Sequence, residues 1–275
     1  MTQSLSHDRA RRIAVISDVH GNSLALRAAL EQARSTGFDD LVILGDLLTY
    51  GCAPKEVLDL TGEAMDRHAA HLITGNHDQL YFDLAVGRTQ YYDGLPAWLR
   101  ETVDWTRETL ADFDLKAQFT WKSDLALDTI FFAHANPFDY GDWAYLNAPA
   151  DLGRARDALV QRGYPVGVFG HTHRPRVAEF SPAAEPDCVI REVNDDIRML
   201  FRPKSAPSTV LANPGSVGQS RAASKASTTM TLSAGDNALE IAFSRLEYDM
   251  EAHCRAIETS SMSEQTKLKL LGFFR

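Results

Sequence analysis

The stretch VGVFGHTHRP, residues 166–175, ends an apolar run with two histidines that one threonine separates. In a β-strand, side chains two positions apart lie on the same face, so His171 and His173 could face one object together. Taken alone the pair is weak evidence, because a histidine pair beside a loop is more often solvated surface than a set of ligands. Its interpretation depends on partners elsewhere in the chain.

Four earlier apolar runs also end in side chains that can bind metal. The runs and the residues that follow them are RIAVIS with Asp18 and His20, LVILG with Asp46, HLIT with Asn76 and His77, and TIFFA with His134. Each piece alone has a simpler explanation, since G-D and G-N are common turn dipeptides. Chance does not explain all of them in order, each after an apolar run. Because sites in open α/β sheets form at the carboxyl ends of strands, we expect these side chains to gather at one edge.

The set of side chains predicts a centre with two metal ions. Two carboxylates, an amide oxygen and four imidazoles are too many ligands for one ion, but they suit two divalent ions that share a bridging ligand. The mixture of nitrogen and oxygen favours Mn, Fe, Zn, Ni or Co over Ca or Mg alone. Two ions about 3.5–4 Å apart clamp a phosphoryl group and lower the pKa of a bridging water. The chemistry indicated is hydrolysis of phosphoric esters.

Strands and helices alternate over the first part of the chain. Apolar runs predict strands, and helix formers with a final glycine or an initial proline predict helices. The expected strands are 12–17, 41–45, 71–74, 128–135 and 166–170, and the expected helices are 23–37, 54–65 and 158–163. This order is typical of parallel βαβ units.

The later segments favour antiparallel hairpins. One is expected between CVIREV and IRMLFR around 194–196, and another between ASTTMTLS and ALEIAFSRLE around 235–237, because both turns have hairpin composition. The chain from Tyr248 onward is expected to be helical. PKSAPS, residues 203–208, resembles a linker but is too short to divide domains.

An aromatic-rich helical segment interrupts the alternation at about residues 79–125. Trp98 and Trp105 are seven positions apart and share one helical face, which favours core packing over a lid that contacts substrate. Both alternatives stay open. We expect packing for the tryptophans and substrate contact for Tyr91 or Tyr92.

Composition limits the classes of protein. The chain has 275 residues, 44% hydrophobic and 24% charged, which suits a globular protein with a large core. No apolar run approaches the roughly 20 residues that span a bilayer, and the first one meets Asp18 too soon for a signal peptide. We therefore expect a cytoplasmic protein without a membrane partner. The net charge of −9 argues against stable nucleic-acid binding, and the three cysteines lack zinc-site or disulfide spacing.

Together the motifs resemble a known family. DVHGN, GDLLTYG, GNHD, the histidine of AHANP, and GHTH resemble the five ordered motifs of the calcineurin-like metallophosphoesterases. NPGSVGQ, residues 213–219, resembles a further motif of their small prokaryotic phosphodiesterase branch, and RLEYD (245–249) also fits. The resemblance implies an α/β fold of two packed mixed β-sheets flanked by helices, an αββα sandwich. It implies a single domain over residues 1–275, with the 79–125 segment as an insert.

The resemblance also implies roles for individual residues. One metal would be held by Asp18, His20, Asp46 and His173, and the other by Asp46, Asn76, His134 and His171, with Asp46 as the bridge. His77 would contact the phosphate together with Asn76 and would protonate the leaving oxygen. Asn213, Gly215 and Ser216 would shape the floor of the substrate site.

One departure from the family pattern bears on the substrate. The Ser/Thr protein phosphatase branch carries G-D-x-x-D-R-G, whereas this chain has Thr49 and Tyr50 in place of the Asp and Arg. In that branch the Asp orients the catalytic histidine and the Arg grips the phosphate. A protein phosphatase is therefore disfavoured. Symmetrical dinucleoside polyphosphate hydrolases share D-R-G, so that interpretation is also less favoured, without being excluded.

The expected function is that of a phosphoesterase with two divalent metal ions, manganese among the candidates. We expect it to hydrolyse phosphodiesters through a metal-bridging hydroxide, with a small anionic phosphoester as its substrate. A phosphomonoesterase and a dinucleoside polyphosphate hydrolase are the alternatives among enzymes. A catalytically silent binding scaffold of the same fold is the alternative from another class, and the intact ligand set and His77 argue against it.

Overall fold

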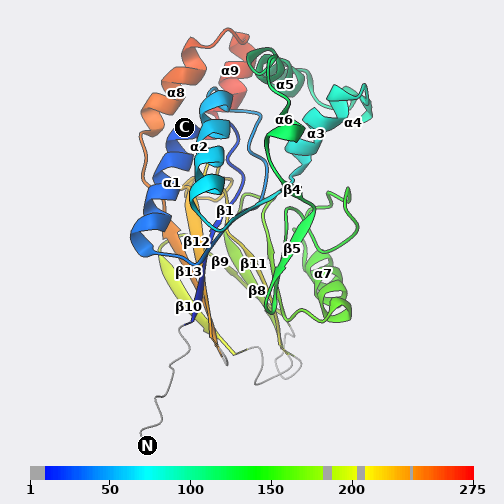
Figure 1. Cartoon of the computed structure of the whole chain (residues 1–275), viewed down its shortest axis with the longest axis vertical. Coiled ribbons are helices and arrows are strands. Elements are labelled where there is room, and N and C mark those ends of the chain that lie inside the picture. Colours follow the sequence, from blue (N-terminus) through cyan, green and yellow to red (C-terminus); the bar gives the residue numbers. More distant parts are fainter. Residues whose placement is uncertain (1–9, 182–187, 203–207, 236–237) are drawn as a thin grey trace, which may run out of the picture.

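The computed structural model describes residues 10–181, 188–202, 208–235 and 238–275. Within them, two mixed β-sheets are stacked against each other, and helices cover both outer faces (Figure 1). The αββα sandwich expected from the sequence is confirmed.

The larger sheet has seven strands in the order β10-β13-β12-β1-β2-β3-β4. Their bounds are β1 (Arg11–Ile16), β2 (Asp40–Ile43), β3 (Ala70–Ile73), β4 (Trp121–Lys122), β10 (Ile197–Phe201), β12 (Thr228–Ala234) and β13 (Leu239–Arg245). The smaller sheet has six strands in the order β5-β6-β7-β11-β8-β9. Their bounds are β5 (Asp124–Leu127), β6 (Ile130–Ala133), β7 (Val166–Phe169), β8 (Arg176–Phe180), β9 (Cys188–Glu192) and β11 (Thr209–Asn213).

The larger sheet contains four adjacent parallel strands, and the smaller sheet contains three. The parallel neighbours are β1, β2, β3 and β4 in the larger sheet, and β6, β7 and β11 in the smaller one. Helices α1 (Ser23–Thr36) and α2 (Pro54–Arg67) connect β1 to β2 and β2 to β3, so the predicted βαβ units are confirmed. The carboxyl ends of parallel strands meet at one edge, so both sheets present several such ends to the same region.

The other helices lie on the outer faces and at one end of the sandwich (Figure 1). Their bounds are α3 (Asn76–Ala85), α4 (Gln90–Asp93), α5 (Ala97–Thr109), α6 (Leu115–Gln118), α7 (Pro149–Arg162), α8 (Met250–Thr259) and α9 (Glu264–Leu271). Helix α7 covers the smaller sheet, while α5, α8 and α9 gather at the end drawn at the top of Figure 1. Within the described ranges no helix is long and apolar enough to cross a membrane.

The two-residue period of the strands sorts apolar side chains into layers. Val15 of β1 packs between the sheets, whereas the next residue, Ile16, packs under the helices on the outer face. Phe132 of β6 likewise lies between the sheets, and Phe131 faces α7. Successive side chains of a strand point to opposite faces, so one short strand fills two layers.

One expected hairpin is wrong. β9 pairs with β8 in the smaller sheet, and β10 pairs with β13 in the larger sheet, so 193–196 cross from one sheet to the other. Val193 turns into the core between the sheets, which anchors this crossing. The other expected hairpin, β12 with β13, is confirmed, although 236–237 of its turn lie outside the described residues, as do 203–207 of the linker-like piece.

The aromatic segment forms α3 to α6 and packs against the C-terminal helices. Trp98 and Trp105 lie in an apolar cluster that includes Tyr50, Ile257 and Leu270. Core packing, the interpretation favoured for the two tryptophans, is confirmed. The Tyr92 hydroxyl donates to Asp104 within the segment at 2.6 Å, so Tyr92 belongs to the packing as well.

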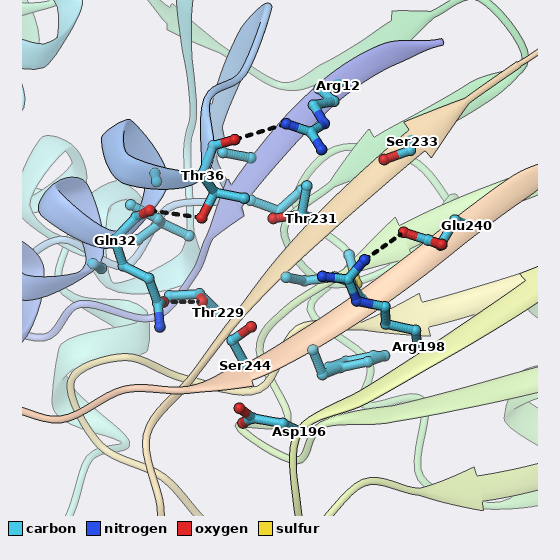
Figure 2. A pocket seen from close by; sticks show the side chains of 18 of the residues that line it. Arg12, Gln32, Thr36, Asp196, Arg198, Thr229, Thr231, Ser233, Glu240 and Ser244 are labelled. Atoms are coloured by element: carbon cyan, nitrogen blue, oxygen red, sulfur yellow. Dashed lines mark hydrogen bonds and ion pairs between the residues drawn. The ribbon is translucent and has the colours of Figure 1, made fainter.

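A groove of about 270 Å³ lies between α1 and strands β10, β12 and β13, apart from the strand ends described below (Figure 2). Its charged groups already have partners within the protein. Arg12 donates to the Thr36 carbonyl oxygen at 2.7 Å, and Arg198 lies 3.6 Å from Glu240. The groove shares no residue with the expected metal ligands, and we assign it no chemistry.

A mutation of Phe132 tests whether the layer between the sheets is tightly packed, because the side chain of Phe132 is 0% exposed. Phe132→Ala should lower the free energy of unfolding by about 3–5 kcal/mol, since the sandwich cannot collapse fully around the lost ring. Chemical denaturation measures this. The control is Leu268→Ala on α9, where the side chain is 70% exposed and the change should stay within about 0.5 kcal/mol. Equal effects at the two positions would contradict the placement of Phe132.

Candidate metal centre

The side chains expected to bind metal come together at the carboxyl ends of β1, β2, β3, β6 and β7. They form two buried groups with one member in common. The groups are Asp18, His20, Asp46 and His173, and Asp46, His134 and His171, with the ligand atoms of each group within 4.8 Å of one another. Asn76 joins the second group, because its Oδ1 atom is 3.1 Å from Nε2 of His134. The grouping is the one that the family resemblance implies.

Each imidazole of the two groups is anchored by a backbone carbonyl. The outward ring nitrogens and their partners are His20 Nδ1 with Leu48 O (3.0 Å), His134 Nδ1 with Leu44 O (2.6 Å), His171 Nε2 with Trp143 O (3.0 Å) and His173 Nδ1 with Gln219 O (2.6 Å). A carbonyl oxygen only accepts, so in the neutral form of each ring the outward nitrogen has the proton and the inward nitrogen presents a lone pair.

The inward nitrogens lie close to one another. His20 Nε2 is 3.1 Å from His173 Nε2, and His134 Nε2 is 3.2 Å from His171 Nδ1. Two lone pairs that face each other at this distance repel unless a proton or a metal ion lies between them. Together with the carboxylates, this donor set fits divalent metal ions of the kind that nitrogen and oxygen ligands bind.

Asp46 is the member that both groups share. Its Oδ2 atom lies 3.6 Å from His20 Nε2 and 3.4 Å from His134 Nε2. Its Oδ1 atom accepts a hydrogen bond from the backbone N–H of His77 at 2.8 Å. One oxygen is therefore fixed by the backbone, which holds the other between the two groups.

Burial and neighbouring charge set the protonation of these groups. Burial lowers the pKa of His171 to about 3 and that of His20 well below its ordinary value. Burial acts to raise the pKa of Asp46, but the facing imidazoles bring it well below its usual range. For His134 burial acts to lower the pKa, but Asp46 raises it to about 9. Neutral imidazoles and ionised carboxylates are the forms that bind metal, so a metal must displace the His134 proton.

Five of these residues have a left-handed backbone, which residues other than glycine seldom adopt. The φ angles are 55° at Asp18, 49° at His20, 53° at Asp46, 66° at His171 and 57° at His173. β7 ends at Phe169, one residue before the expected end of this strand, so the strand geometry that suggested a common face for His171 and His173 does not apply to them. They belong to the loop after it, and each faces a different group. The strained backbone is what turns closely spaced side chains into the same small volume.

Sequence reasoning missed the carboxylate that holds the loop after β2. Asp78 accepts hydrogen bonds from the backbone N–H groups of Asp46 (2.7 Å), Leu47 (3.0 Å) and Gly75 (2.9 Å). Its burial, reinforced by the nearby charge of Asp46, raises its pKa to about 7. The signal was its place in GNHD, because an acidic residue at the third position of a helix commonly caps it.

The residues expected at the floor of the site hold its loops in place. Asn213 donates to the Gly170 carbonyl oxygen at 2.6 Å and accepts from the Gly215 N–H at 2.9 Å. Ser216 donates to the Asp18 carbonyl oxygen at 2.7 Å. These bonds tie the loop after β11 to the loops after β7 and β1. Contact of the three residues with substrate stays a prediction.

His77 belongs to neither ligand group but lies beside them. Its ring centroid is 5.2 Å from that of His20, and its Nε2 atom is 3.3 Å from the Tyr50 hydroxyl. Its Nδ1 atom is buried and has no hydrogen-bond partner among the described residues. Burial lowers the pKa of His77 to about 4. Tyr50, which stands where the phosphatase pattern has Arg, is therefore the partner of this imidazole.

Aromatic residues form the rim of the centre. Tyr91 is 45% exposed, and its hydroxyl accepts a hydrogen bond from Asn76 Nδ2 at 3.2 Å. Tyr145 is also 45% exposed, and its ring is stacked on His171 with the centroids 4.1 Å apart. An open hollow of about 590 Å³ borders Tyr91 on α4. No pattern in the sequence pointed to Tyr145, which lies in an irregular loop.

The comparisons with known proteins agree with this geometry. Residues 12–237 match the family model of the calcineurin-like phosphoesterase superfamily domain. An uncharacterised protein of Methanocaldococcus jannaschii, MJ0912, is 28% identical over 260 residues, which are 92% of this chain and 94% of that protein.

Two solved structures have a similar fold over nearly their whole length. A metallophosphoesterase from Sphaerobacter thermophilus has a TM-score of 0.73 and 25% identity, with 95% of this chain and 98% of that chain covered. The hypothetical protein PH1004 from Pyrococcus horikoshii has a TM-score of 0.71 and 19% identity, with 94% and 97% covered. With the family model matched over most of its length, this chain belongs to the calcineurin-like phosphoesterase superfamily.

Proposed function

We propose that the protein is a phosphodiesterase that uses two divalent metal ions and acts on small anionic phosphoesters. The observation that supports this most is the pair of buried ligand groups that share Asp46. In this proposal the first group holds one ion, and the second group, completed by Asn76, holds the other. Mn, Fe, Zn, Ni and Co suit these ligands. When bound, such ions polarise phosphoryl oxygens and lower the pKa of a water molecule.

His77 is the proposed general acid. Its backbone N–H is held by Asp46 and its ring lies beside the first ligand group, so in this proposal the ring is in position before substrate binds. Burial lowers the pKa of His77 to about 4, which favours the neutral imidazole in the free protein. The negative charge of a bound phosphoester favours the protonated imidazole. The proton is then available to the leaving alcohol oxygen as its bond to phosphorus breaks.

One feature supports a diester over a monoester. The hollow of about 590 Å³ shares Tyr91 with the rim of the centre, and in this proposal the second alcohol of a diester extends past that ring. Tyr50 stands where the phosphatase pattern has Arg, so the phosphate-gripping residue of that branch is absent from this position. The phosphomonoesterase stays the alternative, and a comparison of substrates decides between them.

Metal content tests the ligand groups. After loading with Mn, elemental analysis should find two ions per chain, and chelation should abolish hydrolysis until Mn is restored. Asp46→Ala should reduce the content below one ion per chain, because it removes the shared ligand and unbalances both groups. Asp157→Asn, an exposed carboxylate on α7, is the control and should leave both ions in place. A wild-type protein that binds at most one ion would contradict the proposal.

Paired substrates test the class of ester. The Mn-loaded protein should hydrolyse bis(4-nitrophenyl) phosphate with a kcat/KM at least about 10-fold above that for 4-nitrophenyl phosphate, a difference of about 1.4 kcal/mol in transition-state stabilisation. The reverse order would favour the phosphomonoesterase. Hydrolysis of neither ester with both ions bound would favour the silent scaffold, unless a dinucleoside polyphosphate is cleaved.

His77→Ala separates proton transfer from metal binding. Since His77 lies in neither ligand group, the variant should keep two ions per chain and the wild-type thermal unfolding temperature. Its kcat should fall by about 10²–10⁴ for diesters with a poor leaving group, the usual contribution of a positioned general acid. The loss should be smaller for nitrophenyl esters, whose leaving group needs less protonation. An equal loss for both ester types would assign His77 to phosphate binding alone.

A further inference from the structure

Arg221 lies next to both ligand groups, on the loop after β11. Its backbone N–H donates to the carbonyl oxygen of His173 at 3.1 Å. Its guanidinium lies close to the hydroxyl of Tyr145, the residue whose ring is stacked on His171. Arg221 is therefore bonded to one ligand of the first group through its backbone, and its side chain lies near the residue that covers one ligand of the second group.

The guanidinium has no carboxylate of its own. It is partly buried, and it makes no ion pair with any carboxylate in the part of the chain that the structure describes. Asp18 is the acidic residue that acts on it most, but the carboxylate of Asp18 already faces the His173 ring at 3.2 Å and accepts from the His171 N–H at 3.1 Å. Arg221 is thus a cation near the two ligand groups that has no carboxylate partner among the described residues.

The surroundings of Arg221 indicate which anion it takes. The guanidinium is close enough to His77 and Tyr50 for its charge to influence both side chains, so it lies in the neighbourhood of the proposed general acid. A partly buried cation without a partner is unfavourable, and divalent ions in the neighbouring groups would add to the repulsion. The planar guanidinium matches two oxygens of a phosphoryl group. An anion placed among the metal ligands, His77 and Arg221 would satisfy all of them.

We propose that Arg221 binds the non-bridging phosphoryl oxygens of the substrate, with Tyr145 holding its guanidinium in position. This assignment rests on the proposed function, since it concerns the same site. In this proposal Arg221, on the loop after β11, supplies the positive charge that the phosphatase pattern places at the position of Tyr50. Arg221 would then be a substrate-binding residue that the five family motifs do not include.

Titration calorimetry with inorganic phosphate tests the role of Arg221 directly. Phosphate is added to Mn-loaded wild-type protein, to Arg221→Gln and to the matched control Arg174→Gln. Arg174 lies next to His173, but its side chain is exposed, so its loss removes the same charge from the same neighbourhood. Arg221→Gln should weaken phosphate binding by about 10- to 100-fold, the effect of losing hydrogen bonds to a charged group. It should keep two ions per chain, and Arg174→Gln should bind phosphate like the wild type.

Two results would overturn the assignment. Wild-type affinity in Arg221→Gln would show that the guanidinium does not contact the anion. An equal loss in both variants would show a general effect of charge rather than a contact. If Arg221→Gln loses metal or unfolds, Arg221→Lys decides, because it keeps the charge without the planar guanidinium. An affinity between wild type and a 100-fold loss supports the contact with two phosphoryl oxygens, and full affinity contradicts that contact.

Hydrolysis measurements keep the two proposals apart. If the wild-type protein cleaves no phosphoester, the proposed function fails, but the calorimetry still shows whether Arg221 binds phosphate. If the wild type cleaves diesters and phosphate affinity is unchanged in Arg221→Gln, the role of Arg221 fails and the proposed function stands. In the expected case Arg221→Gln also raises KM for the diester, as its phosphate affinity falls.

Discussion

The metal centre depends on a steric constraint: loops from two different sheets have to approach until their backbones touch. A side chain on Gly218 would overlap the backbone carbonyl of Val19, and one on Gly45 would overlap the backbone of Gly75. These glycines let the loops after β1, β2, β3 and β11 lie against one another. Ligands with side chains as short as Asp and Asn can meet only because the chains behind them are in contact. The sandwich supplies the fixed strand ends from which such loops start.

A second constraint is that many polar side chains are buried together in a small volume and each needs a hydrogen-bond partner. Most of these partners are backbone groups. Each ligand histidine gives its outward N–H to a carbonyl oxygen, and Asp78 takes up three backbone N–H groups at once. Backbone partners are harder to move than side chains. The inward lone pairs therefore keep their directions, which is how a site prepares for a metal without a separate folding step.

The sequence was sufficient for the features that repeat locally. The alternation of apolar runs with helix formers predicted the βαβ units, and polar residues placed directly after those runs predicted which side chains meet. It was insufficient where the outcome depends on distant partners. The turn at 194–196 has the composition of a hairpin, yet the buried position of Val193 sends the chain into the other sheet. Composition near a turn does not specify which strand a segment pairs with.

The same limit applies within the site. His171 and His173 were rightly expected to face a common centre, but for the wrong reason, because left-handed loop residues rather than strand geometry direct them. Tyr145 and Arg221 lie in loops without periodicity and approach the ligands only through the folded chain. Short motifs identified the residues of the two ligand groups, while the positions of Tyr145 and Arg221 depend on how loops from both sheets meet.

The hydrogen bond from the His77 N–H to Asp46 Oδ1 connects the two halves of the chemistry through a single carboxylate. Any change in the charge borne by Oδ2 must redistribute electron density over both oxygens, and so must alter that hydrogen bond. The amide of His77 would therefore serve as a spectroscopic probe: its chemical shift and its exchange with solvent deuterium would change when an ion binds to Asp46 Oδ2. Such a change would reach His77 through the carboxylate alone and would require no movement of the chain.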